Sequence, residues 1–160
     1  MSQVRIETTR EALLDKGVPA FGLAEGANVL TLDGALPVEY LTPGDRILTR
    51  SGVRRLKAVE MSRVTHARMV RISADVLGSG KPEAEVLVVA SQPVLIRDWR
   101  AKALYGAEQA LVPAARLADG EYIRAEIMRE VRVFTLKLDS AAVIYAGGLE
   151  LACEAETVPA

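Results

Sequence analysis

The sequence predicts an all-β fold. From Gly22 onward, short apolar runs rich in β-branched residues alternate with turns that contain glycine, proline or aspartate. Such runs are typical of strands, and the stretches between them are too short for the crossover helices of a parallel α/β sheet. The predicted strands lie in the runs NVLT, RILT, RMVRI, EVLVVA, PVLI, RVFTLKL and AAVIYA.

The residues before the first run have a different pattern, which predicts a helix over residues 1–17. The sequence TTRE matches a capping box, the run ALL gives an apolar stripe, and Gly17 supplies a stop signal at the end. We therefore expect two parts, an N-terminal helical arm over residues 1–21 and a β domain over residues 22–160.

Three local features are predicted inside the β domain. Pro93 cannot donate a ladder hydrogen bond, so the strand run that contains it is expected to bend or bulge there. Residues 98–104 and 113–118 are each predicted to form a brief helical turn. Trp99 and Tyr105 are expected to pack a small core beneath the first of these turns, with a ligand platform as the alternative.

The composition narrows the class of protein. The net charge is −1 at pH 7 and 50% of the residues are hydrophobic, which is typical of a soluble globular chain. A basic stretch over residues 46–71 lacks aromatic residues for base stacking, so nucleic acid is not an expected partner. The single cysteine excludes an intrachain disulfide and a cysteine-based zinc site, and we expect no metal and no cofactor.

Signals for export and for membrane insertion are missing from the sequence. The N-terminus lacks the apolar core of a secretory signal, and no apolar run reaches the roughly 18 residues of a membrane helix. We therefore predict a soluble cytoplasmic protein without a membrane partner, with export by a signal-independent route left open. The sequence identifies neither a protein partner nor an oligomeric state.

Four blocks of the sequence, in a fixed order, carry a resemblance to a known family. They are GANVLTLDGALPVEYLTPGDRILTRSG, VRISADVLGSG, RDWRAKALYGAEQALVPAARLADG and VFTLKLDSAAVIYAGGLELAC. Over residues 22 to about 153, the chain resembles the Hint domain of hedgehog C-terminal regions and inteins, and in particular a bacterial Hint subgroup. The resemblance implies a compact, disc-shaped all-β fold whose two ends meet beside a reactive centre. It also implies an activity, because Hint domains rearrange the peptide bond at their own first residue.

The resemblance places the family's chemical positions on residues that lack the required groups. An acyl shift needs a thiol or hydroxyl directly after the scissile bond and a group that protonates the leaving amide nitrogen. By resemblance, the nucleophile corresponds to Gly22, and residues 18–27 contain no serine, threonine or cysteine. The family's hydroxyl and histidine correspond to Val89 and Gln92, and a further histidine corresponds to Ala141.

Two hypotheses of function compete at this stage. The first is a catalytically degenerate Hint domain, a pseudo-enzyme that does not cleave itself and acts as a binding or assembly module. The second is an autoprocessing domain that uses displaced groups, namely Cys153, Ser91 and His66. Taken singly, Cys153 is favoured as a small buried residue and His66 as a surface or structural one. If the resemblance holds, the positions of the degenerate site are expected to converge with Cys153.

Overall fold

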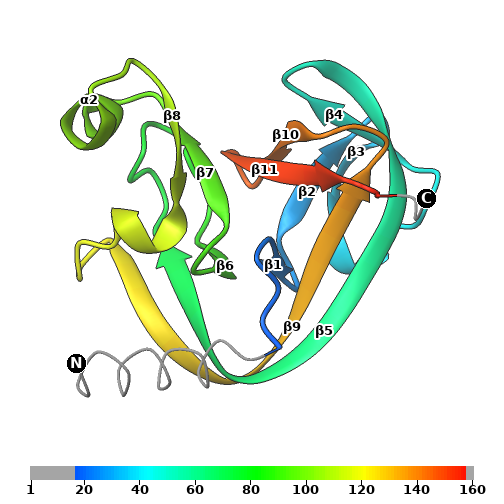
Figure 1. Cartoon of the computed structure of the whole chain (residues 1–160), viewed down its shortest axis with the longest axis horizontal. Helices are drawn as coiled ribbons and strands as arrows, with labels where there is room; N and C mark the ends of the chain where they lie inside the picture. The colour runs from blue at the N-terminus through cyan, green and yellow to red at the C-terminus, as the bar shows by residue number, and fades with distance from the viewer. Residues whose placement is uncertain (1–16, 158–160) are drawn as a thin grey trace.

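The structure is a computed structural model, and it describes residues 17–157. Within these residues the fold consists of strands joined by turns, with one α-helix and two 3-10 helices (Figure 1), so the all-β prediction is confirmed. The predicted N-terminal helix lies outside the described residues, apart from Gly17. The elements are β1 (Leu23–Ala24), β2 (Asn28–Thr31), β3 (Gly34–Pro37), η1 (Val38–Tyr40), β4 (Arg46–Thr49), β5 (Gly52–Ile72), β6 (Val86–Val89), β7 (Pro93–Ile96), α2 (Trp99–Tyr105), β8 (Ala110–Pro113), η2 (Ala114–Leu117), β9 (Ile123–Leu138), β10 (Ala142–Ala146) and β11 (Leu149–Ala155).

The strand order brings the two ends of the domain to the same neighbour. Within residues 17–157 the order is β3-β2-β10-β4-β5-β6-β1-β9-β11-β7-β8, with additional pairings between β2 and β4, β10 and β11, and β5 and β9. The short first strand β1 lies between β6 and β9, and the last strand β11 pairs in parallel with the end of β9. Strand β9 pairs with both β1 and β11 and therefore positions the two ends of the domain.

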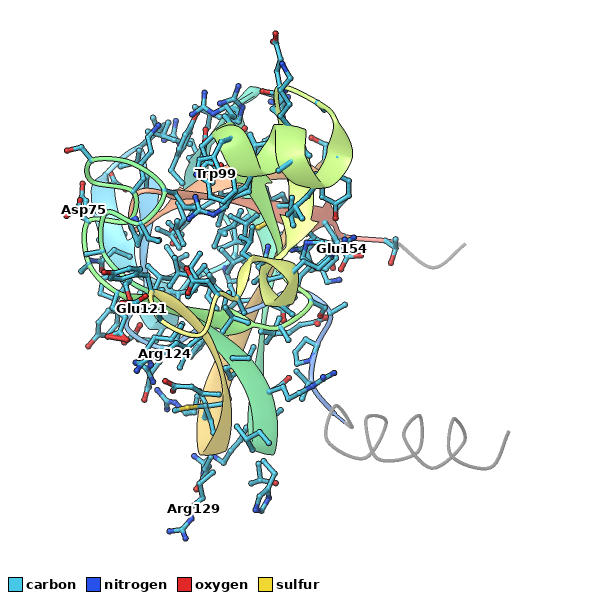
Figure 2. All side chains as sticks on the ribbon, turned by 90° about the vertical axis from the view of Figure 1, so that its left-hand side faces the viewer. Asp75, Trp99, Glu121, Arg124, Arg129 and Glu154 are labelled. Carbon is cyan, nitrogen blue, oxygen red and sulfur yellow. The ribbon has the colours of Figure 1, made fainter. Side chains whose placement is uncertain are left out.

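A long two-stranded ribbon connects the two halves of the molecule. Strands β5 and β9 pair antiparallel from Leu56 opposite Leu138 to Ile72 opposite Ile123. Figure 1 shows this ribbon curving around one side of the fold, and Figure 2 shows Arg129 at its outer bend. The sequence predicts strand only near the end of β5, because charged residues interrupt the apolar pattern in its middle. Pairing with β9 forms the rest of the strand.

His66 has an unusual backbone conformation at the bend of this ribbon. Its φ is 53°, in the left-handed region, while the residues on either side pair in register, Thr65 with Glu130 and Ala67 with Met128. A side chain in this region costs about 1–2 kcal/mol through the clash of its Cβ with the backbone. The imidazole is exposed, so no buried contact offsets that cost.

We therefore expect the substitution His66→Gly to raise the free energy of unfolding by about 1 kcal/mol, because glycine removes the Cβ clash. Urea denaturation of the full chain measures the change. The matched control is Thr65→Gly, which is expected to destabilise the chain because Thr65 lies in regular strand. Equal destabilisation by both substitutions would contradict the left-handed conformation at His66.

Three local predictions have different outcomes. The run around Pro93 is divided into two strands rather than bent, since β6 ends at Val89 and Pro93 is the first residue of β7. The two predicted helical turns are confirmed as α2 and η2. The predicted small core under α2 is wrong, because Trp99 is 70% exposed and Tyr105 is 42% exposed. This helix has only seven residues and buries only Ala101.

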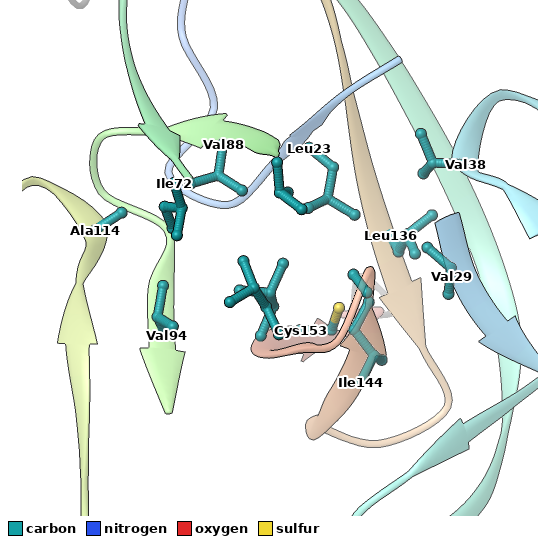
Figure 3. Packing of buried hydrophobic residues seen from close by; sticks show 14 of the residues in the cluster. Leu23, Val29, Val38, Ile72, Val88, Val94, Ala114, Leu136, Ile144 and Cys153 are labelled. Carbon is teal, nitrogen blue, oxygen red and sulfur yellow. The ribbon is translucent and has the colours of Figure 1, made fainter. Parts of the chain in front are cut away.

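Strand β1 lies between two hydrophobic clusters. Leu23 belongs to the larger cluster together with Leu136, Ile144 and Cys153 (Figure 3). The next residue, Ala24, belongs to a smaller cluster, because successive side chains of a strand point to opposite faces. The smaller cluster consists of Ala24, Val64, Ala67, Met69, Val89 and Val133. The peptide bond just before β1 is thus held at the boundary of both cores.

Candidate functional site

The peptide bond between Phe21 and Gly22 is hydrogen-bonded on both sides. The hydroxyl of Thr135 on β9 donates to the carbonyl oxygen of Phe21 over 2.7 Å. The N–H of Gly22 donates to Oε1 of Gln92 over 2.9 Å, and the N–H of Val89 donates to the carbonyl of Gly22 over 3.1 Å. This bond occupies the position that the family resemblance assigns to self-processing. Thr135 and Gln92 hold its two sides, and Val89 holds the next peptide group.

Gln92 uses its whole amide group in this arrangement. Its side chain is 2% exposed, Oε1 accepts from Gly22, and Nε2 donates to the carbonyls of Pro93 and Ala152 over 2.9 and 2.8 Å. The opposite amide orientation would place two donors against the Gly22 N–H and an acceptor against two carbonyls. The contacts therefore fix the oxygen, rather than a donor, on the nitrogen of the Phe21–Gly22 bond.

The space beside Gly22 is filled by neighbouring valines. A Cβ built on Gly22 would overlap Cγ1 of Val133 and would lie 3.4 Å from Cγ1 of Val89. Both valines are fully buried and belong to the same small cluster. A buried methyl group has little room to move in a close-packed interior. The backbone at this position therefore accommodates glycine and excludes larger residues as long as Val133 is present.

Cys153 lies beside the same peptide bond. A cavity of about 10 Å³ is lined by residues of β1, β9, β10 and β11 and by residues just before β1 and β7, namely Phe21, Gly22, Leu23, Gln92, Phe134, Leu136, Ile144, Leu151 and Cys153. Figure 3 shows the sulfur of Cys153 next to Ile144 in this packing. Such a volume is at the lower limit for a single water molecule. Burial, followed by the nearby charge of Glu154, raises the pKa of the Cys153 thiol to about 12.

We expect Cys153 to resist alkylation by iodoacetamide at pH 7 and 8 in the folded chain and to react rapidly in denaturant, because the thiolate is the nucleophile. Mass spectrometry measures the modified fraction.

The raised pKa of Cys153 also affects stability. The pKa of the folded chain lies above the unfolded value of 9.0, so the folded chain holds the proton more tightly. Stability from this group is therefore complete below pH 9 and falls as the pH rises towards 12. The variant Cys153→Ala is expected to lack this part of the pH dependence, and rapid alkylation of the folded chain would contradict the burial.

The other candidate residues are placed differently. Ser91 donates its hydroxyl to the carbonyl of Ala20 over 2.7 Å, just upstream of the Phe21–Gly22 bond. His66 is exposed on the ribbon, and Ala141 is exposed just before β10 and does not line the cavity. The structure thus brings together Gly22, Gln92 and Cys153, with Val89 in contact range of Gly22, and leaves Ala141 outside.

Two residues of β9 belong to this site and are missed by sequence reasoning. Thr135 is 4% exposed and holds the Phe21 carbonyl, and Val133 fills the space beside Gly22. A weak signal exists for Thr135, since it is the only hydroxyl in the apolar run RVFTLKL. No local signal exists for Val133, because its role depends on the pairing of β1 with β9.

Within residues 17–157, no three side chains of the His, Cys, Asp or Glu type are grouped so that they would hold a metal ion. In the same part of the chain, no helix is both long and apolar enough to cross a membrane.

Comparisons with known proteins agree with the observed fold. The chain resembles the solution structure of a bacterial intein-like domain from Clostridium thermocellum, with 16% identity and a TM-score of 0.61 over 83% of this chain and 97% of that one. It resembles the crystal structure of the TvoVMA intein with 13% identity and a TM-score of 0.62, over the same shares. A DnaB intein from Synechocystis matches with 9% identity and a TM-score of 0.57, over 84% of this chain and 99% of that one.

These identities are low enough that the likeness concerns the fold. No curated protein matches the chain in sequence. The model of the family described as "Hint domain" matches residues 21–157, which is most of the chain and begins one residue before Gly22. This chain therefore belongs to the Hint domain family.

Proposed function

We propose that this chain is a non-cleaving Hint domain, which keeps the residues before Gly22 covalently attached and serves as a binding or assembly module. The observation that carries the proposal is the Phe21–Gly22 bond, whose nucleophile position has no side chain and whose side-chain space is filled by Val133. An acyl shift requires an attacking heteroatom on that residue. Glycine supplies none.

Gln92 supports the same conclusion for the second chemical requirement. Cleavage needs a proton on the amide nitrogen as it leaves, but Gln92 presents its oxygen there and accepts the N–H at 2.9 Å. An amide side chain also does not act as an acid near neutral pH. The contact stabilises the intact planar amide and does not help the nitrogen of Gly22 to leave.

Thr135 supports the relation to self-processing domains. Its hydroxyl donates to the Phe21 carbonyl, which is the oxygen that would become negative during an acyl shift. Donors at such an oxygen are worth several kcal/mol to a reaction when an attacking group is present. Here the same contact, together with those of Gln92 and Ser91, ties the segment that leads into β1 to its neighbours.

The alternative is cleavage by displaced groups, and the position of Cys153 in the same cavity is the observation that favours it. Against it, burial raises the pKa of Cys153 to about 12, so the thiol stays protonated at neutral pH. Ser91 is engaged with a carbonyl rather than with a base, and His66 is exposed on the ribbon. The variants Cys153→Ala and His66→Ala are expected to give the same fragment pattern as the natural chain.

A fusion experiment tests the proposed function. A folded reporter protein is attached before Met1 of the full chain, and the purified fusion is incubated at neutral pH with and without a small thiol. A cysteine-dependent intein fused to the same reporter is the positive control. We expect a single uncut fusion on a denaturing gel under both conditions. Release of the reporter with residues 1–21 would overturn the proposal.

A further inference from the structure

A polar groove runs along the edge formed by β7, α2 and the β10–β11 turn. One part is a hollow of about 520 Å³ beside α2, lined by Arg97, Asp98, Trp99, Lys102, Ala107, Glu108 and Gln109. A second part of about 110 Å³ lies towards the β10–β11 turn, lined by Leu77, Lys81, Leu95, Ile96, Arg97, Asp98, Gly148, Leu149 and Glu150. Arg97 and Asp98 belong to both parts, so the two are continuous. None of these residues lines the cavity at Gly22.

The groove contains an exposed aromatic ring on a fixed support. Trp99 is 70% exposed, and Figure 2 shows it beside helix α2. The guanidinium of Arg100 lies 4.8 Å from the ring centroid and is also paired with Asp98, which caps the helix through the N–H of Arg100. The indole is thus presented to solvent by groups that already satisfy one another. An exposed large aromatic side chain is a common feature of binding surfaces.

The other end of the groove is closely packed. A Cβ on Gly148 would overlap the carbonyl oxygen of Gly80 and lie 3.2 Å from the nitrogen of Glu83, so the 75–83 loop lies directly against the β10–β11 turn. The N–H of Glu83 also donates to the carbonyl of Gly147 over 2.8 Å. This end of the groove is therefore formed before any partner arrives, which lowers the cost of binding.

Three charged residues of the groove are in no ion pair within residues 17–157, the two lysines Lys81 and Lys102 and the single acid Glu108. Glu150 is buried and accepts from Arg50 at 2.7 Å and from Arg97 at 2.8 Å, and Asp98 is paired with Arg100. Among the ion pairs of residues 17–157, none involves Lys81 or Lys102, which line opposite ends of the groove. Arg97, whose side chain is 41% exposed, lies between them.

We infer that this groove binds an extended acidic peptide segment of a partner protein, with carboxylates at Lys81 and Lys102 and an apolar side chain against Trp99. Spaced carboxylates fit the two separated lysines and avoid Glu108, the acid of the groove without an ion pair within residues 17–157. A single-stranded nucleic acid fits less well, because sites for it usually follow the backbone with a continuous positively charged groove, whereas the basic residues here are interrupted by Asp98, Glu108 and Glu150. The inference names a partner class for the binding role proposed above, and it does not depend on whether the Phe21–Gly22 bond is cleaved.

The fluorescence of Trp99 tests this inference, because it is the only tryptophan of the chain. The full chain is titrated with a blocked peptide of sequence EELEELEE, with the neutral peptide QQLQQLQQ, and with oligothymidylate. We expect the acidic peptide to change the emission in a saturable way that weakens with salt, because exposed charges are screened. The neutral peptide and the oligonucleotide are expected to bind more weakly.

Charge reversal supplies the matched variants. The double variant Lys81→Glu/Lys102→Glu is expected to weaken binding of the acidic peptide by about tenfold, because two exposed contacts become repulsions. The control Lys57→Glu reverses an exposed lysine outside the groove and is expected to leave the affinity unchanged. Circular dichroism checks that each variant is folded. The inference is overturned by an unchanged emission with the acidic peptide, by equal effects of the double variant and the control, or by tighter binding of the neutral peptide or oligonucleotide. Intact mass on the same sample reports cleavage separately.

Discussion

Replacement of Gln92 by leucine is expected to lower the free energy of unfolding by about 3 kcal/mol or more. Leucine has nearly the same size but supplies neither the acceptor for the Gly22 N–H nor the donors for the carbonyls of Pro93 and Ala152. Each buried polar group left without a partner costs about 1–3 kcal/mol. Equilibrium denaturation of the full chain measures the loss.

The control for this experiment is Gln109→Leu, the same chemical change at an exposed glutamine. It is expected to change the free energy of unfolding by less than about 0.5 kcal/mol, as most surface substitutions do. A loss at Gln92 no larger than at Gln109 would show that the amide does not tie β1 to β7 and β11.

The second large effect is expected at Gly22. The substitution Gly22→Ala places a Cβ into Cγ1 of Val133 and is expected to destabilise the chain by about 3 kcal/mol, which is the scale of overpacking in a rigid core. The effect has one identified source, the overlap with Val133. The next contacts of that Cβ are at ordinary van der Waals distances, 3.4 Å to Cγ1 of Val89 and 3.6 Å to the carbonyl oxygen of Phe134 on β9.

A double-mutant cycle isolates this overlap. In the background Val133→Ala, which removes the overlapping methyl group at the cost of a small cavity, Gly22→Ala is expected to cost less than about 1 kcal/mol. The coupling between the two positions is therefore expected to be about 2 kcal/mol in favour of the double variant. If the cost of Gly22→Ala is the same in both backgrounds, Val133 does not fill the space where a nucleophile would stand.

The fold class follows from features that the sequence shows locally. The β-branched runs between turn residues identify most strands, and the helical turns at α2 and η2 have recognisable starts, with Asp98 capping the first and Pro113 preceding the second. The middle of β5 is different. Its exposed charged residues give no strand pattern, and the strand exists because β9 pairs with it along its length.

The candidate site, like the fold, is only partly predictable from the sequence. Gly22 and Gln92 are found by resemblance, Gly22 because it lies just before the block that begins at Gly26 and Gln92 because residues 89–95 correspond to the family's hydroxyl and histidine segment. Val133 and Thr135 are about 110 residues away in sequence and reach Gly22 only because β1 inserts between β6 and β9. The predicted burial of Trp99 is wrong for a related reason. Large aromatic residues are usually buried, but α2 lies outside the sheet and buries only Ala101.

The central claim is that the Phe21–Gly22 bond stays intact, and the intact mass of the purified natural chain tests it most directly. The chain is incubated for days at neutral pH with a small thiol and, separately, with hydroxylamine, which cleaves esters and thioesters but leaves amides. We predict a single species with the full-length mass of 17.2 kDa in both cases. Fragments that correspond to residues 1–21 and 22–160 would contradict the account.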